Sequence, residues 1–168
     1  AYKSGATVGK LDFVLEQGTC LGVVGESGSG KSTLAQLLVG LYLPSEGNII
    51  LGGKRIDLHK HADIHSLRSK VQLVMQDGRG SLHPYLTIRE ILEEVLKAKN
   101  SKEVGGSLSE LLSQVELPVS VLDRKPGQLS GGECLRVSLA RAMLVQPEIL
   151  ICDESTSALD GRTRDSII

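Results

Sequence analysis

Residues 25–32 read GESGSGKS. They lie between an apolar run, TCLGVV at 19–24, and a segment whose leucines recur at positions 34, 37, 38 and 41. The eight residues fit the pattern G-x-x-x-x-G-K-[ST], and the flanking segments predict the strand before it and the helix after it that this pattern requires. Glycines let successive backbone N–H groups turn toward one point, and the following helix adds the positive end of its dipole. The stretch therefore predicts a loop that binds phosphate groups.

Individual residues of this loop are expected to have separate roles. Lys31 is predicted to reach the β- and γ-phosphates of a nucleotide, and the hydroxyl of Ser32 is placed to bind Mg²⁺. A flexible Gly/Ser turn with a surface lysine is the alternative interpretation. The predicted nucleotide-binding residues are Gly25, Ser27, Gly28, Ser29, Gly30, Lys31, Ser32 and Thr33.

Two carboxylates follow a second apolar run, ILIC at 149–152. Residues beyond the carboxyl end of a strand in a parallel sheet face the ligand crevice, so a carboxylate there can meet a metal ion held by phosphates. Asp153 is the predicted Mg²⁺ residue, and Glu154 is predicted to act on the attacking water. The alternative is that this acidic pair caps a helix.

The segment LSGGE at 129–133 opens a helix that is predicted to run from about residue 131 to residue 144. Ser130 and Glu133 have the spacing of a capping box, which is a sufficient structural explanation for both. The cap does not require Gly131 and Gly132, because each glycine in a helix costs about 1 kcal/mol relative to alanine. Exposed amides would let a phosphate approach closely, so these four residues are a second predicted nucleotide contact.

Composition restricts the class of protein. The chain has 168 residues, which is about one domain, and 40% of them are hydrophobic. The net charge is −1, with one Phe, three Tyr and no Trp, which argues against a nucleic-acid partner. The uncharged run at 34–44 is too short to span a bilayer, and no signal peptide is recognisable. The cysteines at 20, 134 and 152 form no zinc or disulfide pattern and suggest a reducing compartment.

The periodicity along the chain predicts an α/β fold. Strands are expected at 8–16, 19–24, 47–51, 71–75 and 148–152, and a short helix is expected near 64–69. Two capping boxes, at Thr87 and Ser107, begin helices in a stretch otherwise poor in strand signals. We divide the chain into residues 1–76, with an N-terminal antiparallel β portion and the phosphate loop, a helical insert at 77–128, and residues 129–168.

These motifs, in this order, resemble the ATP-binding subunits of ABC transporters over nearly the whole chain. GESGSGKST is similar to their Walker A loop, LSGGE to their signature, ILICDE to their Walker B strand, and residues 157–160 to their D-loop. The resemblance places Gln76 at the Q-loop, as a catalytic residue and metal ligand, and Tyr2 where an aromatic ring stacks on adenine. It implies a P-loop ATPase core, with a parallel sheet flanked by helices.

The resemblance also implies an activity. SLHPYLTIREIL and VLDRKPGQLSGGE are similar to nickel and peptide importer ATPases. Such a subunit would use ATP and Mg²⁺, with Glu154, Lys31 and Gln76 as catalytic residues. It would pair head-to-tail with a second ATP-binding subunit, identical or different, and bind transmembrane permeases at the cytoplasmic face of the membrane. A non-transport ABC ATPase, a P-loop kinase and a nucleotide-gated interaction module without turnover are the alternatives.

Three features depart from the family pattern. Glu133 replaces the usual Gln, Ser155 replaces a common Pro, and the sequence stops at Ile168, before the switch histidine. We therefore expect these 168 residues to be a C-terminally truncated piece that hydrolyses ATP poorly by itself. Leu82, Tyr85 and Leu86 are further expected to contact a membrane subunit, or else to pack as an ordinary loop.

Overall fold

The computed structural model describes residues 9–98 and 108–153. They form two compact units, the first ending at Arg68 and the second beginning at Ser69. Each unit is described by itself. Within the described residues, no helix combines the length and apolar character that crossing a membrane requires.

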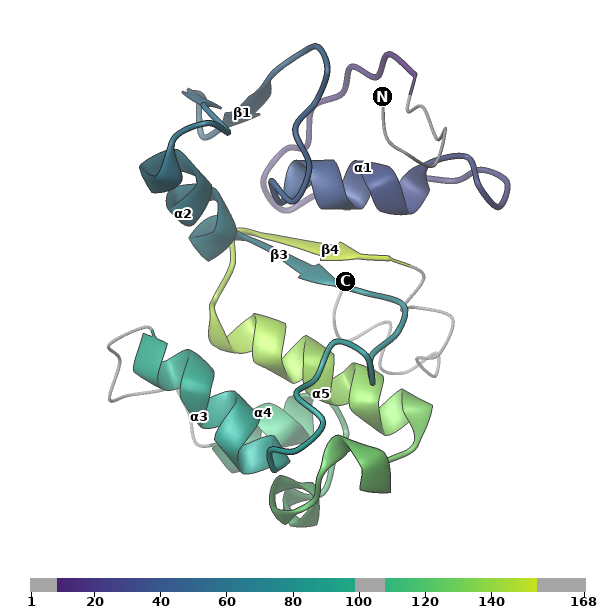
Figure 1. The fold of residues 1–168 in the computed structure, drawn as a ribbon, viewed down its shortest axis with the longest axis vertical. Coiled ribbons are helices and arrows are strands. Elements are labelled where there is room, and N and C mark those ends of the chain that lie inside the picture. Colours follow the sequence, from purple (N-terminus) through teal and green to yellow (C-terminus); the bar gives the residue numbers. More distant parts are fainter. Residues whose placement is uncertain (1–8, 99–107, 154–168) are drawn as a thin grey trace. The chain divides into compact units, whose positions relative to one another are not determined.

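The first unit combines helices with a short β-hairpin (Figure 1). Helix α1 (Lys31–Leu38) follows the glycine-rich loop, and α2 (His61–Lys70) leads into the second unit. Strands β1 (Ile49–Leu51) and β2 (Lys54–Ile56) pair antiparallel. The turn between them is Gly52-Gly53, with φ of 56° and 76°. Positive φ at both central residues is the geometry of a tight hairpin turn whose twist matches the strands.

Helix α1 ends earlier than the leucine spacing predicts. Gly40 adopts a left-handed φ of 66°, and Arg68 Nη2 donates a hydrogen bond of 2.9 Å to the carbonyl of Gly40. The left-handed φ favours glycine at this position, and a Cβ there would lie only 3.1 Å from a methyl of Leu58. The chain therefore turns away from the helix, and Leu41, expected on its buried face, is 50% exposed.

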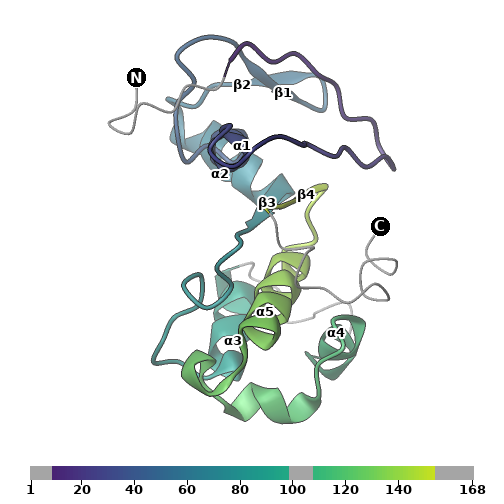
Figure 2. The same cartoon turned by 90° about the vertical axis from the view of Figure 1, so that its right-hand side faces the viewer.

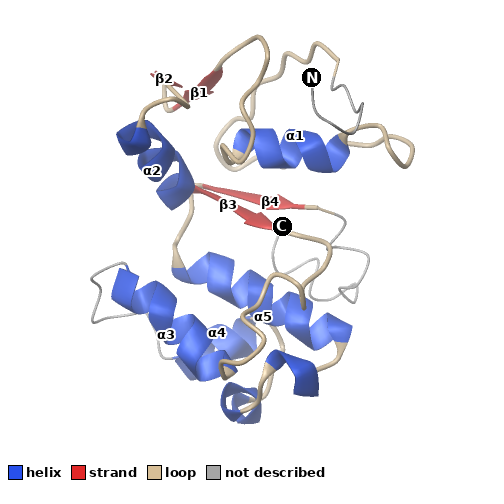
Figure 3. Ribbon diagram, viewed as in Figure 1, coloured by secondary structure: helices blue, strands red, loops and turns tan. Residues whose placement is uncertain are grey.

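The predicted strands before the phosphate loop do not form. Residues 9–24 are loop, which contradicts the expectation for 19–24 and for the described part of 8–16 (Figure 3). A strand is stabilised by the ladder it makes with a neighbour, and in the part of the chain that the structure describes these segments pair with none. Their apolar side chains are accordingly exposed, Val24 to 93%. The antiparallel β portion consists of β1 and β2 alone, among the described residues.

The second unit is a parallel strand pair with a helical layer. Strands β3 (Val71–Val74) and β4 (Ile149–Cys152) pair in register from Val71 with Ile149 to Val74 with Cys152. Between them the chain forms α3 (Ile88–Ala98), α4 (Leu108–Gln114), the 3₁₀ turns η1 (Val119–Asp123) and η2 (Pro126–Gln128), and α5 (Gly131–Leu144). The parallel sheet, the helical insert and the helix at 131–144 follow the sequence predictions.

The core of the second unit lies between α5, α3 and α4. Helix α5 packs on β3 and on both other helices, and Figure 2 shows α3 and α5 side by side. The side chains of Ile88, Leu92 and Leu112 are fully buried there. The capping box at Thr87 forms as predicted, because Glu90 Oε2 accepts hydrogen bonds from the Thr87 N–H at 2.7 Å and from its hydroxyl at 2.8 Å.

Candidate functional site

The loop at 25–32 is open and its amides have no side-chain cap. Gly28 and Gly30 have φ of 83° and 96°, a region that other residues rarely adopt. Gly30 is the N-cap of α1 and contributes no side-chain hydrogen bond, while its carbonyl accepts the N–H of Leu34 at 2.8 Å. The first amides of α1 are therefore available to an anion at the positive end of the helix.

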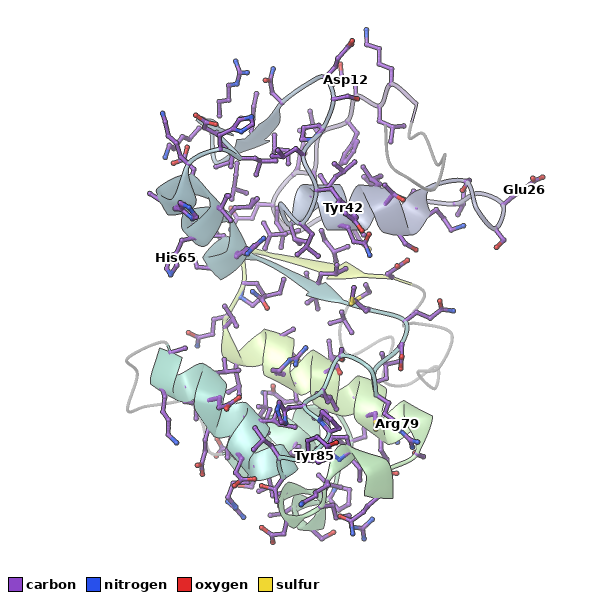
Figure 4. All side chains as sticks on the ribbon, in the orientation of Figure 1. Asp12, Glu26, Tyr42, His65, Arg79 and Tyr85 are labelled. Carbon is purple, nitrogen blue, oxygen red and sulfur yellow. The ribbon has the colours of Figure 1, made fainter. Side chains whose placement is uncertain are left out.

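Lys31 bends back over this loop. Its Nζ donates hydrogen bonds of 2.9 Å each to the carbonyls of Gly25 and Glu26. These contacts hold the ammonium group at the first two residues of the loop. Glu26 lies at the outer end of the loop (Figure 4). The loop thus presents a fixed positive charge together with backbone donors, the combination that binds phosphate oxygens.

Gln76 and Asp153 leave the same edge of the sheet in the second unit. Val74 and Cys152 are register partners at the carboxyl ends of the two strands, and the Asp153 N–H donates to the Val74 carbonyl at 3.0 Å. The strand pair therefore brings these two predicted site residues to one edge. An amide and a carboxylate oxygen are the hard donors that Mg²⁺ accepts alongside substrate phosphates, so the donor chemistry at this edge fits this ion.

The N-terminus of α5 carries the predicted capping box. Glu133 Oε2 accepts the Ser130 N–H at 2.7 Å, and Ser130 Oγ accepts the Glu133 N–H at 3.2 Å. A Cβ built on Gly131 or Gly132 would meet nothing within 4 Å, so both face open space. The structural role of Ser130 and Glu133 is thereby established, and the exposed backbone beside them remains accessible to a ligand.

The two capping boxes predict how stability depends on pH. The pKa of Glu90 and that of Glu133 lie below the ordinary value of 4.5. The largest cause is the hydrogen bond that each carboxylate accepts from a backbone N–H, of Thr87 and of Ser130 respectively. The hydrogen bond with the hydroxyl of the same residue is the second cause. Their contribution to stability is complete above that ordinary pKa and is lost as the pH falls through the lower folded-state pKa. We expect the Glu90→Gln, Glu133→Gln double variant to lack this pH-dependent component.

Thermal unfolding of both proteins measures that component. The difference in unfolding midpoint, wild type minus variant, is expected to shrink between about pH 6 and about pH 3. A difference that stays constant across this range would show that the two carboxylates titrate normally.

Several residues predicted to bind nucleotide or a partner lie outside the described residues or pack in the core. Tyr2, Glu154 and the segment 157–160 lie outside the described residues. Leu82 is only 4% exposed and belongs to the core, so the expectation that it contacts a partner is wrong. Leu86 is partly buried and packs against the same core, as the alternative of an ordinary loop holds. Tyr85 is 78% exposed and has the His83 ring edge-on at 6.1 Å between centroids. Of the three, Tyr85 is the most exposed candidate contact.

The sequence analysis missed a group of polar contacts between the segment after Gln76 and α5. Gly78 and Ser81 meet Ser138 and Arg141 there. One signal was available, since Ser138 is a hydroxyl residue within the apolar repeat VSLARAML. Buried hydroxyl groups nearly always have a hydrogen-bond partner, so a buried serine at this position predicts a polar contact with another segment.

Comparison with known proteins gives consistent matches. Residues 8–157 match the family described as ABC transporter. The nickel import ATP-binding protein NikE of Escherichia coli K12 is 43% identical over 159 residues, which cover 92% of this chain and 59% of that protein. The NikE of Shigella boydii serotype 4 matches with the same identity and coverage. The chain thus spans about three-fifths of the length of these relatives.

Solved structures show the same fold. The ATP-binding cassette MJ0796, a dimer in a post-hydrolysis state bound to ADP and Pi, superposes with a TM-score of 0.70 at 32% identity, covering 84% of this chain and 63% of that one. The cbiO1 protein of Clostridium perfringens, part of the ABC transporter complex cbiONQ, has a TM-score of 0.66 at 29% identity, covering 86% of this chain and 57% of that one.

Proposed function

Because the chain belongs to the ABC transporter family, we propose that its protein is the ATP-binding and hydrolysing subunit of an importer for nickel or a peptide-like solute. The loop at 25–32 is the observation that carries this proposal, since its open amides and its held lysine fit the phosphates of ATP. The 43% identity to nickel import ATP-binding proteins supports nickel as the first solute to test.

The proposed mechanism assigns work to each group of residues. Residues 25–33 bind the phosphates, and the charge of Lys31 offsets the charge that develops on the γ-phosphoryl group. Mg²⁺, held by Ser32, Asp153 and Gln76, would supply further neutralisation of the phosphate charge. Glu154 accepts the proton of the attacking water, which is the step that needs a base.

A dimer would complete the site. Residues 130–133 present exposed amides at the positive end of α5, and we place them against the γ-phosphate bound by a second subunit. ATP then stabilises the closed dimer because the phosphate contacts residues 130–133 only in that state. Hydrolysis removes the bridge, and the two subunits separate. A dimeric solved relative bound to ADP and Pi supports this assembly.

Tyr85 is the proposed contact with a permease at the cytoplasmic face of the membrane. Its side chain is 78% exposed. Exposed tyrosines are enriched at protein interfaces, where truncation of an important one costs more than about 1 kcal/mol. We expect Tyr85→Ala to reduce co-purification of the permease subunits at least about fivefold. Val119→Ala, an exposed apolar position of the same unit, is the control; equal recovery with both variants would exclude this contact.

Transport complementation tests the function as a whole. The full-length protein, expressed with its permeases in a strain lacking its own nickel-import ATP-binding subunit, should restore nickel uptake, and its Lys31→Ala variant should not. Restoration of peptide uptake instead would assign the other solute class. Restoration of neither would contradict the importer assignment.

A further inference from the structure

Histidines are concentrated at the start of α2. The 168 residues contain four histidines, and three of them, at positions 59, 61 and 65, lie close together in the sequence. His61 and His65 belong to α2, whereas His59 lies in the turn before this helix. Residues four apart in an α-helix lie on one face, with their Cβ atoms about 5–6 Å apart. The two helical rings are therefore neighbours on the surface of α2.

Both rings are available to a ligand. His61 and His65 are exposed, while Leu67, at 1% exposure, marks the side of α2 that packs inward. Figure 4 shows His65 on the outer side of the helix. Among the described residues, no group forms a hydrogen bond or an ion pair with either ring. An imidazole nitrogen without such a partner keeps the lone pair that binds a metal ion.

The backbone that carries the pair is held in place. Asp63 Oδ1 accepts a hydrogen bond from Lys54 Nζ at 2.7 Å, and Asp63 Oδ2 accepts the Asp57 N–H at 3.1 Å. The Ile64 N–H donates to the Lys60 carbonyl at 3.0 Å. These contacts tie the first turn of α2 to the strand and turn before it. An ordered helix loses less conformational entropy on binding an ion than a flexible segment does, so the pair is preorganised.

The positive charges nearest to the pair are compensated. Lys60, which precedes His61, forms an ion pair with Asp57 at 3.5 Å, and Lys54 forms one with Asp63 at 2.7 Å. The two carboxylates reduce the repulsion that the lysines would exert on a bound cation. The positive end of the α2 dipole opposes a cation as well, and the charge of Asp63 in the first turn offsets it.

We propose that His61 and His65 chelate a divalent transition-metal ion of the nickel, copper and zinc class. Imidazole nitrogen suits these ions, whereas Mg²⁺ and Ca²⁺ prefer oxygen ligands. Within the described residues, no three histidine, cysteine or acidic side chains gather to hold a metal ion. The protein therefore supplies two ligands, and water completes the coordination shell. The pair lies on α2 and not in the phosphate loop, so this inference does not depend on the proposed function.

Calorimetric titration with NiCl₂ tests the site. The full-length protein is used without nucleotide and without a histidine tag, so that neither phosphate-bound metal nor the tag contributes heat. Wild type should bind an Ni²⁺ ion that is bound at least about tenfold more weakly by His61→Ala and by His65→Ala. The double variant should lose no further ion, because both rings hold the same one. Both positions are exposed, so alanine there leaves the fold intact.

His83→Ala is the matched control. His83 is the fourth histidine of these 168 residues and is also exposed, but no histidine lies four residues from it. This variant should bind Ni²⁺ to within about twofold of wild type. Competition identifies the class of ion: Cu²⁺ should displace Ni²⁺, and a roughly tenfold excess of Mg²⁺ should not.

Several results would overturn the proposal. A wild-type Kd for Ni²⁺ weaker than about 1 mM would show that no chelate forms. Equal affinity in wild type and in the His61→Ala, His65→Ala double variant would place the ion elsewhere. Displacement by Mg²⁺ would indicate oxygen ligands instead of imidazoles. Loss of one ion in each single variant and of two ions in the double variant would show two independent rings.

Discussion

Replacing Glu154 by Gln is expected to lower the rate of ATP hydrolysis by about 100-fold or more, while ATP binding is retained. Asp153, the residue before Glu154 in the sequence, lies at the sheet edge, where its N–H donates a hydrogen bond to the Val74 carbonyl at 3.0 Å. A carboxylate can take the proton of the attacking water, whereas an amide cannot. The substitution leaves the proposed phosphate contacts of residues 25–33 and 130–133 unchanged, so the variant should accumulate as an ATP-bound dimer.

A matched substitution makes this result specific. Glu148, the residue before β4, forms an exposed ion pair with Lys70 at 2.6 Å. Glu148→Gln should hydrolyse ATP at the wild-type rate, because exposed pairs contribute little to stability. Turnover is measured by phosphate release, and dimer formation by size-exclusion chromatography with ATP. If Glu154→Gln leaves both properties unchanged, the protein is a nucleotide-gated interaction module without turnover.

Local sequence signals predicted the elements whose causes are themselves local. The helix at 131–144 begins and ends where it was expected, because Ser130 and Glu133 cap one another and the chain turns before Pro147. The capping box at Thr87 and the parallel strands at 71–74 and 149–152 followed in the same way. The phosphate loop was predicted from glycine spacing, and its positive φ angles confirm the reason for glycine there.

Features that depend on distant neighbours were not predicted correctly. Residues 19–24 have the composition of a buried strand, but a strand also needs a partner, and composition does not specify one. Leu82 looked like an exposed apolar residue because its neighbours are polar, yet it packs into the core of the second unit. The contact between Gly78 and α5 joins segments about 57 residues apart, as Gly78 meets Leu135, and no local pattern encodes such a pairing.

Strand β2 of the hairpin was not predicted, although the sequence contains a local signal for it. Gly52-Gly53 between two short apolar or mixed runs is a recognised hairpin signal, and its φ angles are those the signal implies. The polar residues that follow, at 57–63, hid the second strand from a search based on apolar runs. Turn chemistry would have identified β2.

Lys31→Ala is expected to have the second large effect, a loss of ATP affinity. The Nζ of Lys31 is held over the loop by the Gly25 and Glu26 carbonyls, so the charge is in place before a ligand arrives. Each hydrogen bond from a charged group contributes about 1.5–3 kcal/mol. Loss of two such bonds to the phosphates would weaken binding by about 100-fold or more.

Isothermal titration calorimetry of the full-length protein with ATP and Mg²⁺ tests the central claim, that residues 25–32 form a phosphate-binding loop. Wild type and Lys10→Ala, which removes an exposed lysine of the same unit, should bind with equal affinity, and Lys31→Ala should bind at least about 100-fold more weakly. Absence of binding heat in all three proteins, or equal affinity in the Lys31→Ala variant, would contradict the assignment of this loop.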